Sequence, residues 1–201
     1  MKIMLTNARV SFANGLFTAT ALEQGQTPKF GADFIIEPET KVYSITETDG
    51  QKIKKATTMD AAMLAIANEA WKGRGEAMLK TLESSKKSYR DGNLRTNKAG
   101  EVYAGYEDCM YVTAKNQVRP GLFDKDGKTQ LVEADGRIYS GCYVNVSFDL
   151  YAMTDPKKKG VFAKLLGVQF SQDGEAFAGG SVSNGDEFED LAVNEDEGAL
   201  V

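Results

Sequence analysis

The sequence predicts a mainly β fold, a small barrel or sandwich of five or six strands with one inserted helix. Six Asn-Gly or Asp-Gly pairs punctuate residues 1–183. Such pairs suit tight turns, because Asn and Asp tolerate a positive φ and Gly adopts one freely. The segments between the turns are rich in β-branched and aromatic residues, as strands are. The turn pairs begin at Asn14, Asp49, Asp91, Asp126, Asp135 and Asp173.

The expected strands cover residues 1–12, 29–37, 102–115, 137–153 and 160–171. The clearest of them alternates strictly between apolar and polar residues, and successive side chains of a strand point to opposite faces. One predicted face is core and carries Val144, Val146, Phe148 and Leu150. The other is polar with tyrosines on it and carries Tyr143, Asn145, Ser147, Asp149 and Tyr151.

One helical segment interrupts the strands. Thr57 is the expected N-cap, with Asp60 three residues later as a variant of the capping box. Apolar residues then recur at helical spacing, at Met59, Met63, Ile66 and Ala70. We expect this helix to end at residues 71–73 and a second short helix to cover residues 76–82.

The last eighteen residues, 184–201, form an acidic tail with seven carboxylates and no Lys or Arg. The whole chain has 24 basic and 29 acidic residues, so the remaining body keeps 24 basic and 22 acidic ones. A block of like charge with few apolar residues cannot bury enough surface to offset the entropy of ordering. The sequence therefore predicts one domain over residues 1–183 and a disordered tail over residues 184–201. The tail either solubilises the chain or docks on a basic surface through Asp186, Glu187, Phe188, Glu189, Asp190, Glu195, Asp196 and Glu197.

The composition excludes several functional classes. The chain has no histidine, which removes Ser-His and Cys-His catalytic pairs and the common zinc hydrolase sites. Cys109 and Cys142 are expected to be free buried thiols in a reducing compartment. No signal peptide, membrane span, phosphate-binding loop or dinucleotide fingerprint is visible, so we expect a cytoplasmic protein without a cofactor.

Basic residues interleaved with aromatic ones indicate a nucleic-acid surface. Residues 72–98 hold eight basic and three acidic side chains. Cations replace the counterions of phosphates, and flat rings stack on unpaired bases. The expected basic contacts are Lys86, Lys87, Arg90, Arg95, Lys115 and Arg119, and the expected stacking residues are Tyr89, Tyr103, Tyr111, Tyr143 and Tyr151. Phe162 and Lys164 would extend the same surface.

Two alternatives stay open from the residues alone. Glu107, Asp108 and Asp149 lie on expected strands and would serve a metal-dependent nuclease if they gathered around magnesium. The pair Asp124 and Asp126 superficially resembles a calcium loop, but it lacks the further acidic ligands and reads as a hairpin turn. In the second alternative the protein is a structural or adaptor protein of a virion, and the basic segment is only a solvated surface.

Five segments together resemble one family. They are residues 30–38 (FGADFIIEP), 119–124 (RPGLFD), 139–145 (YSGCYVN), 167–170 (GVQF) and 173–176 (DGEA). As a set, they are similar to the single-stranded DNA-binding proteins of tailed bacteriophages, long catalogued as a domain of unknown function. The resemblance implies an OB-fold, a five-stranded Greek-key barrel with a helix inserted between strands, and single-strand binding on one face of the barrel. It also implies an acidic tail used in replication, although this tail ends in Leu200 and Val201 rather than in an aromatic residue.

The resulting hypothesis is a sequence-tolerant, non-enzymatic single-stranded DNA-binding protein of phage replication or recombination. It would protect single-stranded DNA, and its tail would compete with DNA for the basic surface and recruit a polymerase or helicase. The sequence leaves open whether the chain forms a homo-oligomer and whether it prefers DNA to RNA.

Overall fold

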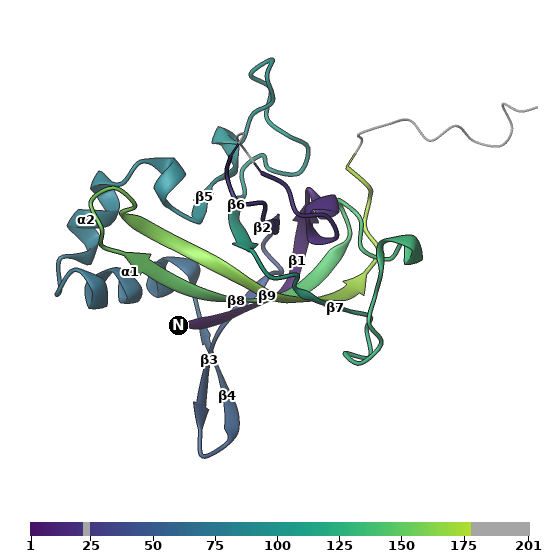
Figure 1. Ribbon diagram of the computed structural model, residues 1–201, viewed down its shortest axis with the longest axis horizontal. Helices are drawn as coiled ribbons and strands as arrows, with labels where there is room; N and C mark the ends of the chain where they lie inside the picture. The colour runs from purple at the N-terminus through teal and green to yellow at the C-terminus, as the bar shows by residue number, and fades with distance from the viewer. Residues whose placement is uncertain (22–24, 178–201) are drawn as a thin grey trace, which may run out of the picture.

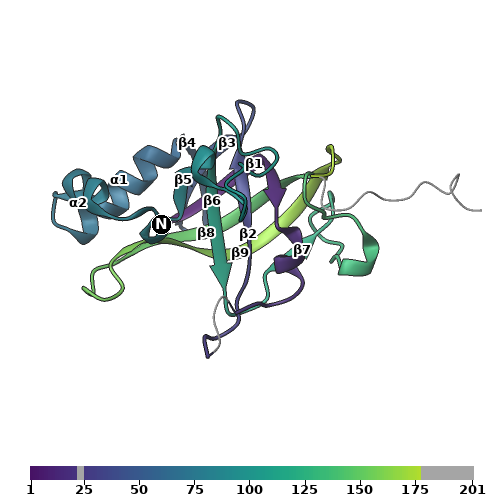
Figure 2. The same cartoon turned by 90° about the horizontal axis from the view of Figure 1, so that it is seen from above.

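Five strands close into a barrel in the computed structural model, which describes residues 1–21 and 25–177. They are β1 (Lys2–Ser11), β2 (Phe30–Ile36), β6 (Met110–Asn116), β8 (Tyr143–Met153) and β9 (Gly160–Gln172). The pairing runs β1–β2–β6–β9–β8 and returns from β8 to β1, with β6 and β9 as a parallel pair (Figures 1 and 2). The chain therefore forms the five-stranded Greek-key barrel of the OB-fold, as the family resemblance implied, and the barrel is the one of the two architectures, barrel or sandwich, that the residues left open.

Four further strands extend the barrel. β5 (Tyr89–Asp91) pairs with β6, and β7 (Gly121–Phe123) pairs with β9. β3 (Lys41–Thr48) pairs with β1 and forms a hairpin with β4 (Gln51–Thr57) that projects away from the barrel (Figure 1). Asp49 and Gly50 form its turn with φ of 51° and 75°. The sequence predicted this turn but not the strands, because residues 51–56 are all exposed and lack the alternation of a half-buried strand.

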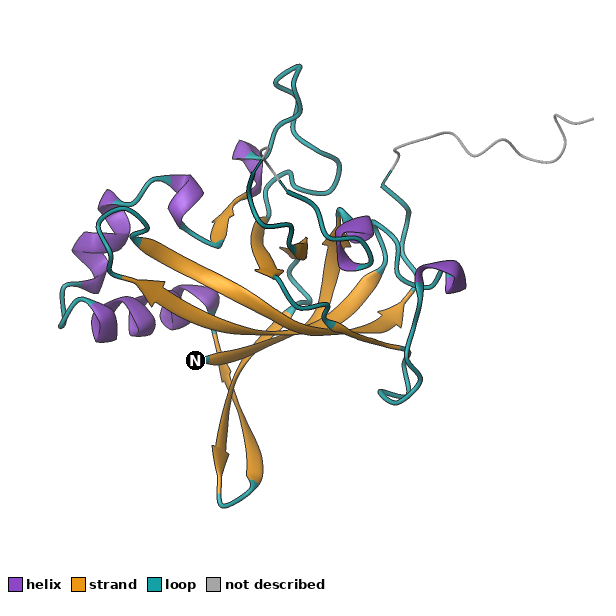
Figure 3. Cartoon of the chain, viewed as in Figure 1, coloured by secondary structure: helices purple, strands orange, loops and turns teal. Residues whose placement is uncertain are grey.

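Two helices pack at one end of the barrel (Figure 3). α1 (Met59–Ala70) and α2 (Gly75–Thr81) confirm the two expected helical segments. Thr58, and not Thr57, is the N-cap, because its hydroxyl accepts a hydrogen bond from the Ala61 amide at 3.1 Å. Met59, Met63 and Ile66 are buried and join the barrel core, which fixes the helix to the barrel.

The barrel core confirms the predicted alternation of β8. Val144, Val146, Phe148 and Leu150 are at most 1% exposed. Burying each of these large side chains contributes roughly 1.5–3 kcal/mol. Phe170 on β9 meets them in the same core. The polar positions between them face outward, as the alternation predicted.

Two expected strands are shorter than predicted. The strand expected at residues 102–115 starts only at Met110, because Gly105 and Asp108 adopt a positive φ that breaks an extended chain. The strand expected at residues 137–153 starts at Tyr143, since Gly141 turns the chain with a φ of 110°. Cys142 is buried, Cys109 is half-buried, and both are free thiols.

In the described part of the chain, no helix is long and apolar enough to cross a membrane.

Candidate nucleic-acid interface

Two adjoining hollows open on the outer side of β2, β5 and β6, strands that lie side by side in Figure 2. The larger has a volume of about 960 Å³ and the smaller a volume of about 400 Å³. Both are lined by Thr20, Gly31, Arg90, Thr113 and Lys115. Because these residues join the two hollows, they form one surface, which we call the groove.

Strand alternation decides which side chains face the groove. β2 pairs with β6 so that Asp33 lies opposite Thr113, and both point outward. The next residue on β6, Ala114, points into the barrel and is fully buried. On β5, Arg90 faces the groove, whereas its neighbour Tyr89 packs against the core. The groove is therefore built from every second residue of three paired strands.

A buried carboxylate holds the groove's two arginines. Asp33 is 2% exposed and accepts hydrogen bonds from Arg95 Nε at 3.1 Å and from the Tyr106 hydroxyl at 2.9 Å. Its other oxygen accepts from the Thr113 hydroxyl, which in turn accepts from Arg90 Nη2. Burial and then the nearby Asp33 carboxylate raise the pKa of Tyr106, so this hydroxyl stays protonated and donates. Asp33 thus positions Arg95 directly and Arg90 through Thr113.

Positive charge is in excess along the groove. Its lining contains the carboxylates Asp33 and Glu133 and the cations Lys29, Lys87, Arg90, Arg95 and Lys115. Partial desolvation is the main cause that lowers the pKa of Lys115. Arg90, Arg95 and Lys29 lower it further, against the opposing effect of Asp33. These positively charged side chains repel one another, and together they create a local positive potential that attracts an anion.

Two buried polar atoms in the groove have no hydrogen-bond partner within the described residues. They are Arg90 Nε and Ser88 Oγ, and both residues line the smaller hollow. Leaving a buried donor unpaired costs about 1–3 kcal/mol, and more for a charged group. The Arg90 guanidinium is held in place by the Tyr111 ring, whose centroid lies 4.9 Å away. The positive charge of Arg90 is therefore incompletely compensated at the wall of the smaller hollow, and an anion bound there would stabilise it.

Aromatic side chains stand at both ends of the groove. Phe12 and Tyr103 pack edge to face with their centroids 5.2 Å apart, and Arg95 lies 4.8 Å from the Phe12 centroid. Tyr151 and Phe162 form a second pair with centroids 6.0 Å apart and line the smaller hollow. Phe12 is 40% exposed and Tyr151 is 42% exposed, so each offers a free ring surface. Such rings can stack on unpaired bases.

The structure brings together about half of the predicted binding residues. Those that line the groove are Lys87, Arg90, Arg95, Lys115 and Tyr151, and the ring of Tyr103 lies beside Arg95, with its centroid 5.8 Å from the guanidinium. Lys86 and Arg119 lie outside its lining, the first at a short 3₁₀ turn before β5 and the second in the loop after β6.

Tyr111 is used for packing, which corrects the prediction for that residue, whereas Tyr89 and Tyr143 are half-buried and lie outside the groove lining, so stacking on them stays a prediction. Tyr111 is 3% exposed and is covered by Tyr106 and Arg90. Tyr89 packs on the core, and burial together with its contact to Asp60 raises its pKa to about 12. Tyr143 lies outside the groove lining, with the Arg9 guanidinium 5.8 Å from its ring centroid. The sequence of a single strand does not show which face of these rings is exposed or which residues surround them.

The groove residues that the sequence analysis did not predict include Phe12, Lys29, Asp33 and Thr113. Asp33 carried a visible signal, since it is a charged residue in the middle of the apolar strand FGADFII. A charge at such a position needs a partner when it is buried. The partners come from sequence positions as far away as Thr113, so the strand alone could not name them.

Acidic residues do not assemble into a metal site in the described part of the chain. Glu107 and Asp108 are exposed in the loop before β6, and Asp149 lies on β8.

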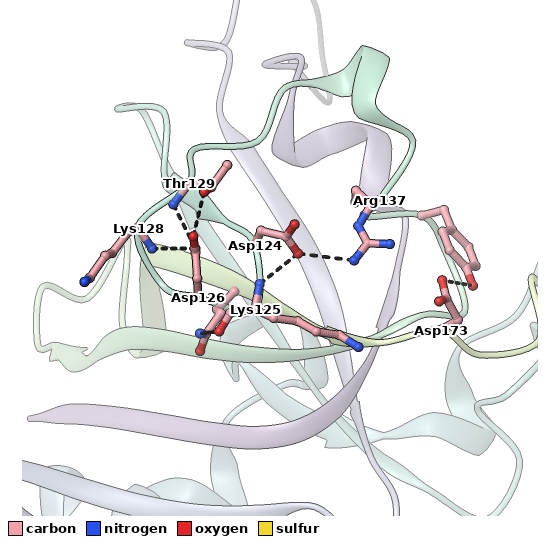
Figure 4. Close-up of polar contacts among 9 residues, drawn as sticks. Asp124, Lys125, Asp126, Lys128, Thr129, Arg137 and Asp173 are labelled. Atoms are coloured by element: carbon pink, nitrogen blue, oxygen red, sulfur yellow. Dashed lines mark hydrogen bonds and ion pairs between the residues drawn. The ribbon is translucent and has the colours of Figure 1, made fainter.

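Figure 4 shows that the candidate calcium loop is a turn held by its own carboxylates. Asp126 accepts from the Lys128 and Thr129 amides, both at 2.8 Å, and Asp124 pairs with Arg137 at 3.3 Å. The Gly127 amide donates to the Asp124 carbonyl and the Asp124 amide to the Thr129 carbonyl, both at 2.9 Å, which confirms a turn at this position.

The acidic tail and its expected partner-binding residues, 186–190 and 195–197, lie outside the described residues.

Comparisons with known proteins agree with this architecture. The family described as Enterobacter phage Enc34, ssDNA-binding protein, matches residues 1–199. The putative protein p50 of Acyrthosiphon pisum secondary endosymbiont phage 1 is 34% identical over 203 residues, which cover 100% of this chain and 99% of that protein.

Two solved structures share the fold. The single-stranded DNA-binding protein from bacteriophage Enc34 in complex with ssDNA has a TM-score of 0.63 and 18% identity, over 88% of this chain and 89% of that one. A second structure of that protein has a TM-score of 0.62 and 17% identity, over 92% of this chain and 88% of that one.

Proposed function

This chain belongs to the family of the ssDNA-binding protein of Enterobacter phage Enc34, and we propose that it binds single-stranded DNA in the groove. The observation that carries the proposal is the state of Arg90. Its guanidinium is held by Thr113 and Tyr111, yet its Nε is buried without a partner in the described residues. A phosphate oxygen is the acceptor that a preorganised arginine fits best.

Charged and aromatic side chains would contact different parts of the DNA in the groove. Arg90, Lys87 and Lys115 would neutralise phosphates along its floor, where they outnumber the carboxylates. Tyr151, with Phe162 beside it, would stack on a base at one end, and Phe12 would do so at the other. Only unpaired bases offer their faces to such rings, so the arrangement favours a single strand over a duplex. None of these contacts reads a base edge, which makes binding tolerant of sequence.

The biological role follows from this binding mode. The body, residues 1–183, would protect single-stranded DNA during phage replication or recombination in the host cytoplasm, as a binding protein and not as a nuclease. The tail, residues 184–201, would compete with DNA for the groove through its seven carboxylates and, once displaced, recruit a polymerase or helicase. The excess of cations in the groove supports this competition.

The test is fluorescence anisotropy of a labelled oligo-dT with the full-length protein at about 0.1 M salt. Each phosphate contact on a single strand contributes a salt slope of about 0.7, hence about 5-fold in affinity at 0.1 M relative to 1 M salt. R90Q and K115Q should each weaken binding by about that factor. R119Q, which removes one exposed positive charge outside the groove lining, should leave binding unchanged. Equal losses for all three variants would contradict the groove.

Two further measurements test competition by the tail and distinguish the binding protein from a nuclease or a virion protein. Removal of residues 184–201 should tighten binding at low salt, and unchanged affinity would show that the tail does not compete. Incubation of labelled single-stranded DNA with the protein and magnesium should leave the strand at full length. Cleavage would favour the nuclease, and absence of any binding at low salt would favour the virion protein.

A further inference from the structure

A row of lysines crosses the sheet from the groove to the projecting hairpin. Strand register places Lys115 of β6 beside Lys164 of β9, and Lys164 beside Asp149 of β8. Asp149 pairs in turn with Lys2 of β1. The same line continues through Ile45 of β3 to Lys54 of β4. We call Lys115, Lys164, Lys2 and Lys54 the lysine row.

The row lies on the outer face of the sheet. Ile3, which follows Lys2, is fully buried, and so are Leu165 and Leu150, which follow Lys164 and Asp149. Since successive residues of a strand point to opposite faces, the row residues point away from the core. Lys164 and Lys54 are exposed and Lys2 is half-buried. Lys115 belongs both to the row and to the groove, so the two surfaces are continuous.

Charge along the row is not balanced by the protein. None of its four lysines forms an ion pair in residues 1–21 and 25–177. Asp149 is the one carboxylate at a registered position of the row. Lys115 and Lys164 are direct neighbours across two strands, and like charges at such positions are destabilising. A polyanion lying across the strands would remove that cost.

We propose that the lysine row continues the path of single-stranded DNA beyond the groove, across the barrel and onto the β3–β4 hairpin. This inference rests on the proposed function. The row crosses five strand-to-strand spacings of about 4.8 Å, which extends the path by about 24 Å. Phe162, two residues before Lys164 on the same face, lies where the groove meets the row. Tyr43 is half-buried beside Ile45 on the same outer face, so the added segment also has a ring near its end.

In this proposal the projecting β3–β4 hairpin binds the far end of the single strand. Figure 1 shows β3 and β4 extending away from the barrel, with β4 at the end of the sheet. Lys54 and Lys55 are adjacent on β4 and therefore point to opposite faces. Only Lys54 belongs to the row, because it pairs with Ile45. The pair offers a control matched in strand, charge and exposure.

The experiment compares two oligo-dT lengths on the full-length protein. A strand of about 5 nucleotides is confined to the groove, whereas one of about 20 nucleotides also reaches the row. For the long strand at about 0.1 M salt, K2Q/K54Q/K164Q should bind roughly 100-fold more weakly, with a salt slope lower by about 2. For the short strand its affinity should equal that of the unaltered protein. K54Q alone should weaken long-strand binding about 5-fold and K55Q should leave it unchanged.

Each outcome decides between the row and its alternatives. If the triple variant keeps the affinity and salt slope of the long strand, the row is not part of the path. That result leaves the groove intact, because the groove is tested separately by R90Q on the short strand. If the loss disappears once residues 184–201 are removed, the row binds the acidic tail and the proposal is wrong. A loss confined to duplex DNA overturns it as well. Matching thermal unfolding of all variants shows that the lysine changes leave the fold intact.

Discussion

Replacement of Asp33 by Asn tests whether one buried carboxylate organises the groove. Asp33 accepts from Arg95, Tyr106 and Thr113, and the substitution keeps the shape of the side chain while it removes the charge. A hydrogen bond to a charged group contributes about 1.5–3 kcal/mol, against about 1 kcal/mol for a neutral one. The loss over three donors is about 3 kcal/mol. This is at the low end of the cost of breaking a buried ion pair, as expected when the Arg95 side chain is 36% exposed.

Urea unfolding followed by the fluorescence of Trp71, the chain's one tryptophan, measures this cost. D33N should lose about 3 kcal/mol of unfolding free energy, or about 6–12 °C in Tm for a domain of this size. D108N is the matched control, because Asp108 is exposed and Asn tolerates its φ of 53°. A loss below about 1 kcal/mol for D33N would refute the role assigned to the carboxylate.

DNA binding by D33N separates positioning from net charge. The variant makes the groove more positive, so charge alone predicts tighter binding of oligo-dT. The structure predicts weaker binding, because Arg95 and, through Thr113, Arg90 lose the group that orients them. Anisotropy at a temperature where D33N is fully folded decides the matter, and tighter binding would show that the arginines do not need Asp33.

The other predictions concern stacking, alkaline pH and one backbone position. Y151A should weaken oligo-dT binding about 5- to 150-fold in an anisotropy titration, since stacking contributes about 1–3 kcal/mol per base, whereas Y143A should leave affinity unchanged. The pKa of Tyr89 is raised to about 12 and that of Tyr106 is also raised, so the fold favours both protonated hydroxyls. Their contribution to stability is complete below pH 10, the ordinary tyrosine pKa, and is lost as the pH rises through the folded values. Urea unfolding between pH 8 and pH 11 should show this decline, and it should be smaller for Y89F. G141A should lower the unfolding free energy by about 1–3 kcal/mol, because Gly141 has a φ of 110° and an added Cβ would lie 2.2 Å from the Glu175 carbonyl oxygen; an unchanged urea midpoint would contradict this.

Features that depend on consecutive residues were accessible from the sequence. The alternation from Tyr143 to Tyr151 predicted which face of β8 is core, and the recurrence of Met59, Met63 and Ile66 predicted the buried face of α1. Both patterns follow from the geometry of one element, which repeats every 2 or 3.6 residues. The hairpin strands β3 and β4 carry no such pattern, since pairing rather than burial makes them strands.

The sequence by itself determined the strand-rich class, the helical insertion and the basic and aromatic composition of the groove, whereas the separation of an acidic tail stays a prediction. Only the tertiary structure decided which of those side chains meet. Asp33 reaches Arg95, Tyr106 and Thr113 across 62 to 80 residues of chain, and strand register aligns Lys115 with Lys164. Tyr89 and Tyr111 turn away from solvent for the same reason, because their faces are set by the strands beside them. Periodicity is a local property of the chain, whereas register is settled by the packing of strands that are distant in sequence.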